Sequence, residues 1–230
     1  MLAVATAPSW VRAQAVAKAG ENHAAAALAL FHQLRGKEGN VFFSPYSIST
    51  AFGMVGAGSK DNTAAEIAKA FHFDSMDSAF HQRFGELTRT LLKNGNKDGD
   101  MLAIANALCV TRHAPKDDYL KFIQTHYDAE IFGGDLDAIN AWAKQKSQGK
   151  IDTILKKLSP NTVCVLLNAV SFKGSWKLAF QESATKDREF SLSAEKKTQV
   201  KMMRQTANFR MLNQETWQVI DLPYATGTSM

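Results

Sequence analysis

Cysteine is scarce in this chain, which holds two cysteines among 230 residues. These two, Cys109 and Cys164, lie far apart, and neither a Cys-x-x-Cys nor a His-Glu-x-x-His motif occurs. The sequence therefore indicates neither a zinc site nor a dense disulfide framework, and no cofactor or metal is expected. So few cysteines leave the redox compartment open.

Long apolar runs and long runs of like charge are also absent. No stretch of 18 or more apolar residues occurs, so the sequence predicts no membrane-spanning helix and no membrane partner. Without a run of five or six like charges, a nucleic-acid-binding tail is not expected, although the formal net charge is +5. The rest of the composition, 45% hydrophobic and 21% charged, is ordinary for a soluble globular protein with a buried core.

Cysteine and histidine side chains can act as nucleophile and base in an enzyme, but their sequence context here does not predict catalysis. Both cysteines lie in apolar runs, and none of the six histidines carries a local catalytic signature. Buried, inert thiols are the simpler interpretation, so no catalytic residue is predicted.

Residues 1–20 are interpreted as a leader or degenerate signal segment, ahead of one domain over residues 21–230. The leader contains an Ala-x-Ala pattern at residues 13–15, of the kind that signal peptidase recognises. It lacks a charged start, and Pro8 interrupts its short apolar part, so a flexible alanine-rich leader is the alternative. An extracellular location is expected, with a cytoplasmic location as the alternative.

Helix signals dominate the chain as far as residue 158. Ser44 followed by Pro45 predicts a helix start after the short apolar strand 41–43, because serine caps helices and proline suits their first position. This helix carries Ile48, Phe52 and Val55 on one face. The expected helices start at Asn22, at Pro45, at the capping box Thr63–Glu66, at Asp77 and at Asp117, and a lysine-rich helix with Trp142 runs to about Leu158.

Short strands are expected toward the C-terminus. Residues 162–167 are β-branched and apolar on both faces, which predicts a central strand covered on both sides. Residues 101–110 fit either a buried strand or a helix. Alternating patterns predict further strands near residues 200–202, 209–211 and 217–219, with a turn at Asn213. Helices followed by strands predict an α+β fold with layered sheets.

Two segments resemble the best-known signatures of the serpin family. One is Asn40-Val-Phe-Phe-Ser-Pro-Tyr-Ser-Ile-Ser49, and the other is Asn168-Ala-Val-Ser-Phe-Lys-Gly-Ser-Trp-Lys-Leu-Ala-Phe180. Shorter similar stretches follow the family's order at residues 58–63, 104–106, 149–151, 200–203 and 221–224. The resemblance covers residues 22–230 and implies N-terminal helices packed on a large mixed β-sheet, plus the first strands of further sheets.

The resemblance also implies two sites. Ser44, Ser47 and Asn168 match the serpin shutter, the hydrogen-bonded cluster beneath the large sheet where its central strands part. Trp176 matches the breach, where the reactive loop first enters the sheet. Without the family context, Ser44 would be a helix cap, Asn168 a strand-end amide and Trp176 a core residue.

The activity that the resemblance implies is inhibition of a serine protease by trapping. In that mechanism the protease cleaves a reactive loop, which then inserts into the large sheet before the acyl-enzyme is hydrolysed. The matching loop and C-terminal segment are expected beyond Met230, so the chain is expected to be a fragment that is inactive and poorly soluble alone. The alternative is a non-inhibitory serpin that acts as a carrier, a chaperone or a glycosaminoglycan-binding protein.

Three basic residues suggest a polyanion partner. Arg83, Arg89 and Lys93 lie on the helix expected from Asp77, at a position that resembles the heparin-binding helix of some serpins. A glycosaminoglycan would bind such a stripe through charge-assisted contacts that weaken with salt. A solvated helix face is the simpler alternative.

Overall fold

The computed structural model describes residues 23–36, 39–96, 100–225 and 228–230. The leader predicted over residues 1–20 and the cap predicted at Asn22 lie outside the described residues. The chain divides into two compact units, one made of residues 1–92 and 103–171 and the other of residues 93–102 and 172–230. None of the helices in the described segments combines the length and apolarity needed to cross a membrane.

Helix α2 (Pro45–Ala57) begins where the sequence predicted, with Ser44 as its N-cap. The Ser44 hydroxyl accepts a hydrogen bond from the Ser47 backbone N–H at 3.2 Å. The predicted strand 41–43 is wrong in this structure, because these residues pair with no other strand, and Phe42 is 100% exposed.

The buried face of α2 differs from the predicted one. Phe52 and Val55 are exposed, whereas Ser49, Thr50, Gly53, Met54 and Gly56 are buried. Small residues allow a neighbouring ring to approach closely, and a Cβ added at Gly53 would lie 2.6 Å from the Tyr127 hydroxyl. Close packing therefore selects the small-residue face of α2.

One helix precedes α2 in the chain, and another follows it. A helix over residues 23–34 buries Ala26, while Leu28 and Phe31 are exposed. Helix α3 (Asp61–Ala70) starts before the predicted capping box, and its N-cap Lys60 makes no side-chain cap. The box at Thr63 was thus wrong, because the helix had already begun at Asp61.

Helices α4 (Ser78–Gly95) and α5 (Asp117–Tyr127) match the predictions. The Asp77 carboxylate accepts a hydrogen bond from the Phe80 backbone N–H at 2.8 Å, which starts α4. Helix α5 ends at Tyr127, and its C-cap Asp128 has a left-handed backbone with φ 49°.

The main sheet has three described strands in the order β2-β1-β3: β1 (Met101–Val110), β2 (Ala129–Gly133) and β3 (Cys164–Lys173). Residues 101–110, for which the sequence allowed either a strand or a helix, form strand β1. This strand pairs in parallel with β2 from Asn106↔Ala129 to Val110↔Gly133. Strand β3 lies at the edge of the described sheet, not in the predicted central position.

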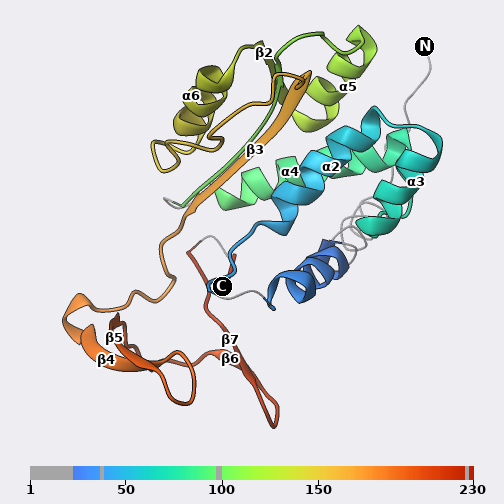
Figure 1. Ribbon diagram of the computed structural model, residues 1–230. Helices are drawn as coiled ribbons and strands as arrows, with labels where there is room; N and C mark the ends of the chain where they lie inside the picture. The colour runs from blue at the N-terminus through green and yellow to red at the C-terminus, as the bar shows by residue number, and fades with distance from the viewer. Residues whose placement is uncertain (1–22, 37–38, 97–99, 226–227) are drawn as a thin grey trace. The chain divides into compact units, whose positions relative to one another are not determined.

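Both faces of the sheet are covered (Figure 1). Helix α6 (Leu136–Lys146) packs on one face through Ile139 and Trp142, and α2, α4 and α5 pack on the other. Cys109 belongs to the α6 face and Cys164 to the opposite one. Because their side chains point to opposite sides of the sheet, the two cysteines cannot form a disulfide.

Helix α6 is shorter than predicted. It ends at Lys146, not near Leu158, and residues after it form turns and an extended segment. Gln148, directly after the C-cap Ser147, has a left-handed backbone with φ 55°, and the Gly149 N–H donates to the Lys144 carbonyl at 2.8 Å, which closes the helix end.

The second unit contains two antiparallel strand pairs. The alternating patterns predicted the strands near residues 200–202, 209–211 and 217–219 but missed the one at residues 186–191. The turn predicted at Asn213 is wrong, because Asn213 is the last residue of a strand and pairs with Gln218. Strand β4 (Lys186–Ser191) pairs with β5 (Lys197–Met202), and β6 (Arg210–Asn213) pairs with β7 (Gln218–Asp221). A short 3-10 helix, η1 (Glu182–Ala184), precedes β4. Helices followed by sheets confirm the predicted α+β class.

Candidate functional site: a polar junction between strands β1 and β3

Two asparagines join the strands β1 and β3 inside the first unit. The Asn168 amide N–H donates to the Asn106 Oδ1 at 2.7 Å, and the Asn106 amide N–H donates to the Tyr127 backbone carbonyl at 2.8 Å. Asn106 is only 3% exposed. The Asn168 Oδ1 is also buried, and within the described segments it has no hydrogen-bond partner. A buried acceptor without a donor is rare and marks a place where a further group can dock.

Ser44 and Ser47 stay together at the start of α2. Ser44 acts as the helix cap, and in the described part of the chain the Ser47 hydroxyl makes no hydrogen bond. Neither serine hydrogen-bonds to Asn168 in this structure. The structure thus brings two of the three predicted shutter residues together, and the shutter role of all three stays a prediction.

Asn106 was missed as a site residue by sequence reasoning. A polar amide in the otherwise apolar run of β1 was the available signal, since a buried amide must find partners. Its partner Tyr127 continues the polar chain, because the Tyr127 hydroxyl lies 2.6 Å from His81 Nδ1. Burial raises the pKa of Tyr127 and lowers that of His81 to about 4, so both side chains are neutral near pH 7.

The buried His81 predicts an acid-sensitive stability. Burial lowers its pKa from 6.5 to about 4, with Asp77 opposing and His126 adding to the shift. Between pH 6.5 and pH 4 the histidine binds a proton in the unfolded chain but not in the folded chain. The contribution of His81 to the free energy of unfolding is therefore fully present above pH 6.5 and is lost as the pH falls toward 4. The full effect is on the order of 3 kcal/mol.

Urea unfolding between pH 7 and pH 4 tests this expectation. We expect the unfolding free energy to fall less steeply with acid in His81→Gln than in the natural protein. His113→Gln, in an exposed turn, is the matched control and should keep the natural slope. Equal slopes in all three proteins would contradict the assignment to His81.

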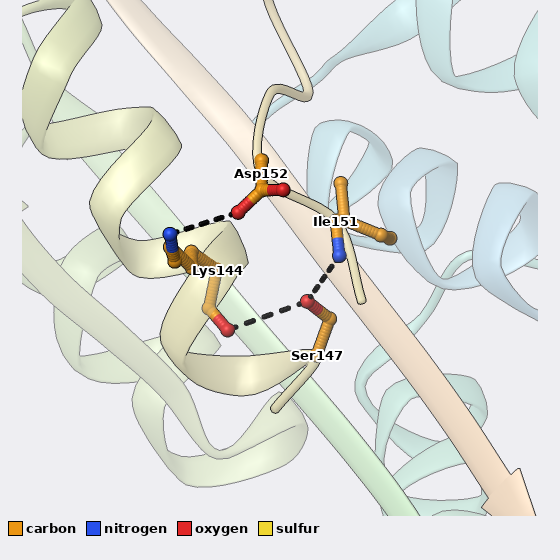
Figure 2. A network of polar contacts seen from close by, with 4 residues as sticks. All are labelled: Lys144, Ser147, Ile151 and Asp152. Carbon is orange, nitrogen blue, oxygen red and sulfur yellow. Dashed lines mark hydrogen bonds and ion pairs between the residues drawn. The ribbon is translucent and has the colours of Figure 1, made fainter. Parts of the chain in front are cut away.

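Hydrogen bonds and an ion pair join the segment after α6, at residues 151–152, to the end of that helix (Figure 2). Lys144 Nζ forms an ion pair with Asp152 at 2.8 Å, and the Ile151 N–H donates to the Ser147 hydroxyl at 2.9 Å. Further along, the Asn140 side chain accepts from the Ile154 N–H at 2.9 Å and donates to the Leu155 carbonyl at 2.9 Å. These contacts hold the segment on the helix that covers the sheet.

Trp176 lies in the second unit and is half-buried. Its ring stacks on Tyr224 with centroids 4.5 Å apart, and the two residues form an isolated β-bridge. A Cβ at the neighbouring Gly174 would lie 2.5 Å from the Phe172 ring and 2.8 Å from the Tyr224 ring, so a larger residue there would displace these rings. The breach role predicted for Trp176 is not tested by these contacts.

The three residues predicted to bind a polyanion all lie on α4, but they do not form a single continuous basic surface. Arg83 is half-buried and Arg89 is exposed in the first unit, whereas Lys93 falls in the second unit. Glu86 lies between Arg83 and Arg89 along the helix and accepts a hydrogen bond from Gln82 at 3.3 Å. An acid therefore interrupts the basic stripe.

No group of three or more histidine, cysteine, aspartate or glutamate side chains in the described segments is arranged to hold a metal ion.

Comparison with known proteins identifies the family. The family model described as Serpin (serine protease inhibitor) matches residues 21–230. The leukocyte elastase inhibitor of Sus scrofa is 36% identical over 214 residues, which cover 86% of this chain and 56% of that protein. Leukocyte elastase inhibitor A of Mus musculus is 37% identical over 216 residues, with 87% and 56% covered. This chain belongs to the serpin family, and it spans about half the length of these curated relatives.

Solved serpin structures share the fold. The reactive-loop-cleaved human thyroxine-binding globulin has a TM-score of 0.85 at 28% identity and covers 94% of this chain and 68% of its own. The thermophilic serpin Tengpin in the latent state has a TM-score of 0.78 at 28% identity, with 90% and 57% covered. The predicted serpin-like α+β fold is therefore confirmed, in an incomplete form among the described strands.

Proposed function

We propose that this protein acts as a serine protease inhibitor that traps its target by inserting a cleaved loop into the main sheet. Family membership supports the proposal, and one structural observation carries it. Among the described residues the buried Asn168 Oδ1 has no hydrogen-bond donor, and Asn168 lies on β3, the edge strand of the described sheet. An acceptor without a donor and an unpaired edge on the same strand suit the docking of an additional strand.

The proposed mechanism follows from this arrangement. A strand that inserts beside β3 gains a ladder of backbone hydrogen bonds, and this gain can drive displacement of a protease attached to the loop. The described residues supply β3 and its polar junction but neither the reactive loop nor a second central strand. Trapping is accordingly proposed for the protein with those parts present, and inactivity is proposed for the described residues alone. The protein then acts as an inhibitor and not as an enzyme.

Protease incubation tests the proposal. Protein isolated from its natural source, with its intact mass and C-terminal sequence determined, is mixed with leukocyte elastase and with trypsin-like and chymotrypsin-like proteases. The names of the curated relatives make elastase the first choice. We expect a complex that survives SDS with at least one protease, because an acyl-enzyme bond links the two proteins.

A protease whose active-site serine is replaced by alanine is the matched control, since it cannot form the acyl-enzyme and should give no stable complex. Cleavage of the protein without any SDS-resistant complex, across all three proteases, would instead indicate a non-inhibitory serpin.

Binding of a glycosaminoglycan is a second candidate function, and the exposed Arg89 on α4 supports it. A guanidinium pairs well with sulfate groups, and the attraction weakens with salt. The nearby Glu86 opposes this attraction, which makes the site weaker than an uninterrupted basic stripe. We rank this function below protease inhibition.

A further inference from the structure

The strand pair β4–β5 in the second unit separates its charges by face. Residues 186–189 alternate in charge, and successive side chains of a strand point to opposite sides. Both acids of this run meet partners on one face: Asp187 pairs with Lys201 at 3.6 Å and Glu189 with Lys197 at 2.6 Å. The acidic side chains of β4 are thus already engaged with lysines of β5.

The opposite face of the pair carries the two cations of the same run. The register places Lys186 across from Met202 and Arg188 across from Val200, and neither partner is charged. In the part of the chain that the structure describes, Lys186 and Arg188 make no ion pair or side-chain hydrogen bond. One face is therefore electrically balanced, and the other is purely cationic.

One hollow opens beside the cationic face, and a second hollow shares Arg204 with it. The first has a volume of about 230 Å³ and is lined by Ser183, Ala184, Lys186, Arg188 and Arg204. The second has a volume of about 330 Å³, and its polar lining comes from Gln181, Arg204, Gln205 and Thr206. Neither lining contains an aspartate or glutamate: Glu182 lines neither hollow, and Asp187 and Glu189 are paired with lysines on the opposite face of the strand pair.

The side chains around the hollows are rich in hydrogen-bond donors. Guanidinium and ammonium groups only donate, and the hydroxyl and amide side chains can add further donors. Arg204 makes no ion pair or side-chain hydrogen bond with other described residues, so its planar group is free for a ligand. Guanidinium groups bind sulfate and phosphate oxygens in a bidentate manner, which fits a tetrahedral oxyanion.

We propose that this surface binds a molecule that carries two sulfate or phosphate groups, one in each hollow, with the Arg204 guanidinium between them. An isolated surface cation is usually solvated and contributes little. Here three cations line the first hollow, Arg204 also lines the second, and neither lining contains an acid, which favours a paired anion over scattered solvation. No residue of α4 lines the hollows, and the proposal does not depend on protease inhibition.

Titration with small anions at constant ionic strength tests the proposal. Isothermal calorimetry of the full chain compares inorganic phosphate, inorganic sulfate and pyrophosphate. Because pyrophosphate carries two linked groups, we expect it to bind at least about tenfold more tightly than phosphate. A sulfated disaccharide and a nucleoside diphosphate then distinguish the two sources of such groups, and tighter binding of either one identifies its class.

Three variants locate the binding site. Arg204→Gln should weaken pyrophosphate binding by about tenfold or more, because it removes charge-assisted hydrogen bonds in both hollows. Lys201→Gln removes one charge from the opposite face of the same strand pair and should change the affinity less than about twofold. Arg89→Gln on α4 should also leave the affinity unchanged.

Circular dichroism confirms that each variant is folded before its affinity is compared. Equal weakening by Arg204→Gln and Lys201→Gln would show unspecific attraction by net charge and overturn the proposal. Loss of binding only in Arg89→Gln would move the site to α4, and the absence of saturable binding by any probe would also overturn it.

Discussion

Replacing Asn106 by alanine is expected to lower the free energy of unfolding of the first unit by about 2 to 6 kcal/mol. The Asn106 side chain accepts from Asn168 and donates to the Tyr127 carbonyl, so its removal leaves two buried polar groups without partners. Each unsatisfied buried group costs about 1–3 kcal/mol. Because the same side chain joins β1 to β3, this variant also loosens the strand on which the proposed insertion depends.

Urea unfolding followed by far-UV circular dichroism measures the effect. Asn161→Ala is the matched control, since Asn161 is exposed and its side chain makes no hydrogen bond in the described structure. We expect the control to change stability by less than about 0.5 kcal/mol. If Asn106→Ala were as mild as the control, the polar junction would contribute nothing to the fold.

Replacing Trp142 by alanine is expected to cost about 3–5 kcal/mol, the range for removing a large buried aromatic side chain. Trp142 is 6% exposed and packs with Ile139 and Leu167 between α6 and the sheet. Its indole N–H donates to Glu130 Oε2 at 2.9 Å, and Glu130 also pairs with Lys146. The variant therefore loses both buried area and the contact that ties α6 to β2.

Two further variants separate these contributions. Trp142→Phe keeps most of the ring but removes the donor, and we expect a loss of about 1 kcal/mol from the missing hydrogen bond. Trp217→Ala, at a tryptophan that is 49% exposed, is the control and should have little effect on the first unit. Circular dichroism is again the measurement, because the variants change the fluorescent residue itself. A loss in Trp142→Ala as small as in the control would show that α6 does not depend on this anchor.

Local helix signals were reliable where a single side chain sets the start. The Ser44 cap and the Asp77 cap both appear where the sequence predicted them, since a hydroxyl or carboxylate can satisfy the free N–H groups of a first turn. The capping box at Thr63 failed because α3 begins earlier, at Asp61. A capping residue therefore identifies the start of a helix only when no residue before it in the chain already starts that helix.

The candidate site was predictable in part. Asn168 was identified through the family resemblance, and its hydrogen bond to Asn106 places it at a junction between strands. Asn106, Tyr127 and His81 were missed as site residues, because their roles depend on contacts between segments 21 to 46 residues apart in the chain. The basic residues of the proposed anion site show the same limit, since only the strand register assigns their faces.

The sequence by itself determined the family, the α+β class, the main helices and three of the four described C-terminal strands, because periodicity, caps and signature segments act over short distances along the chain. Tertiary structure alone decided which face of α2 is buried, where α6 ends and how Asn168 is paired. It also separated Cys109 from Cys164 and left Arg204 beside two hollows. These outcomes depend on close approach between distant segments, and packing, not local propensity, controls that approach.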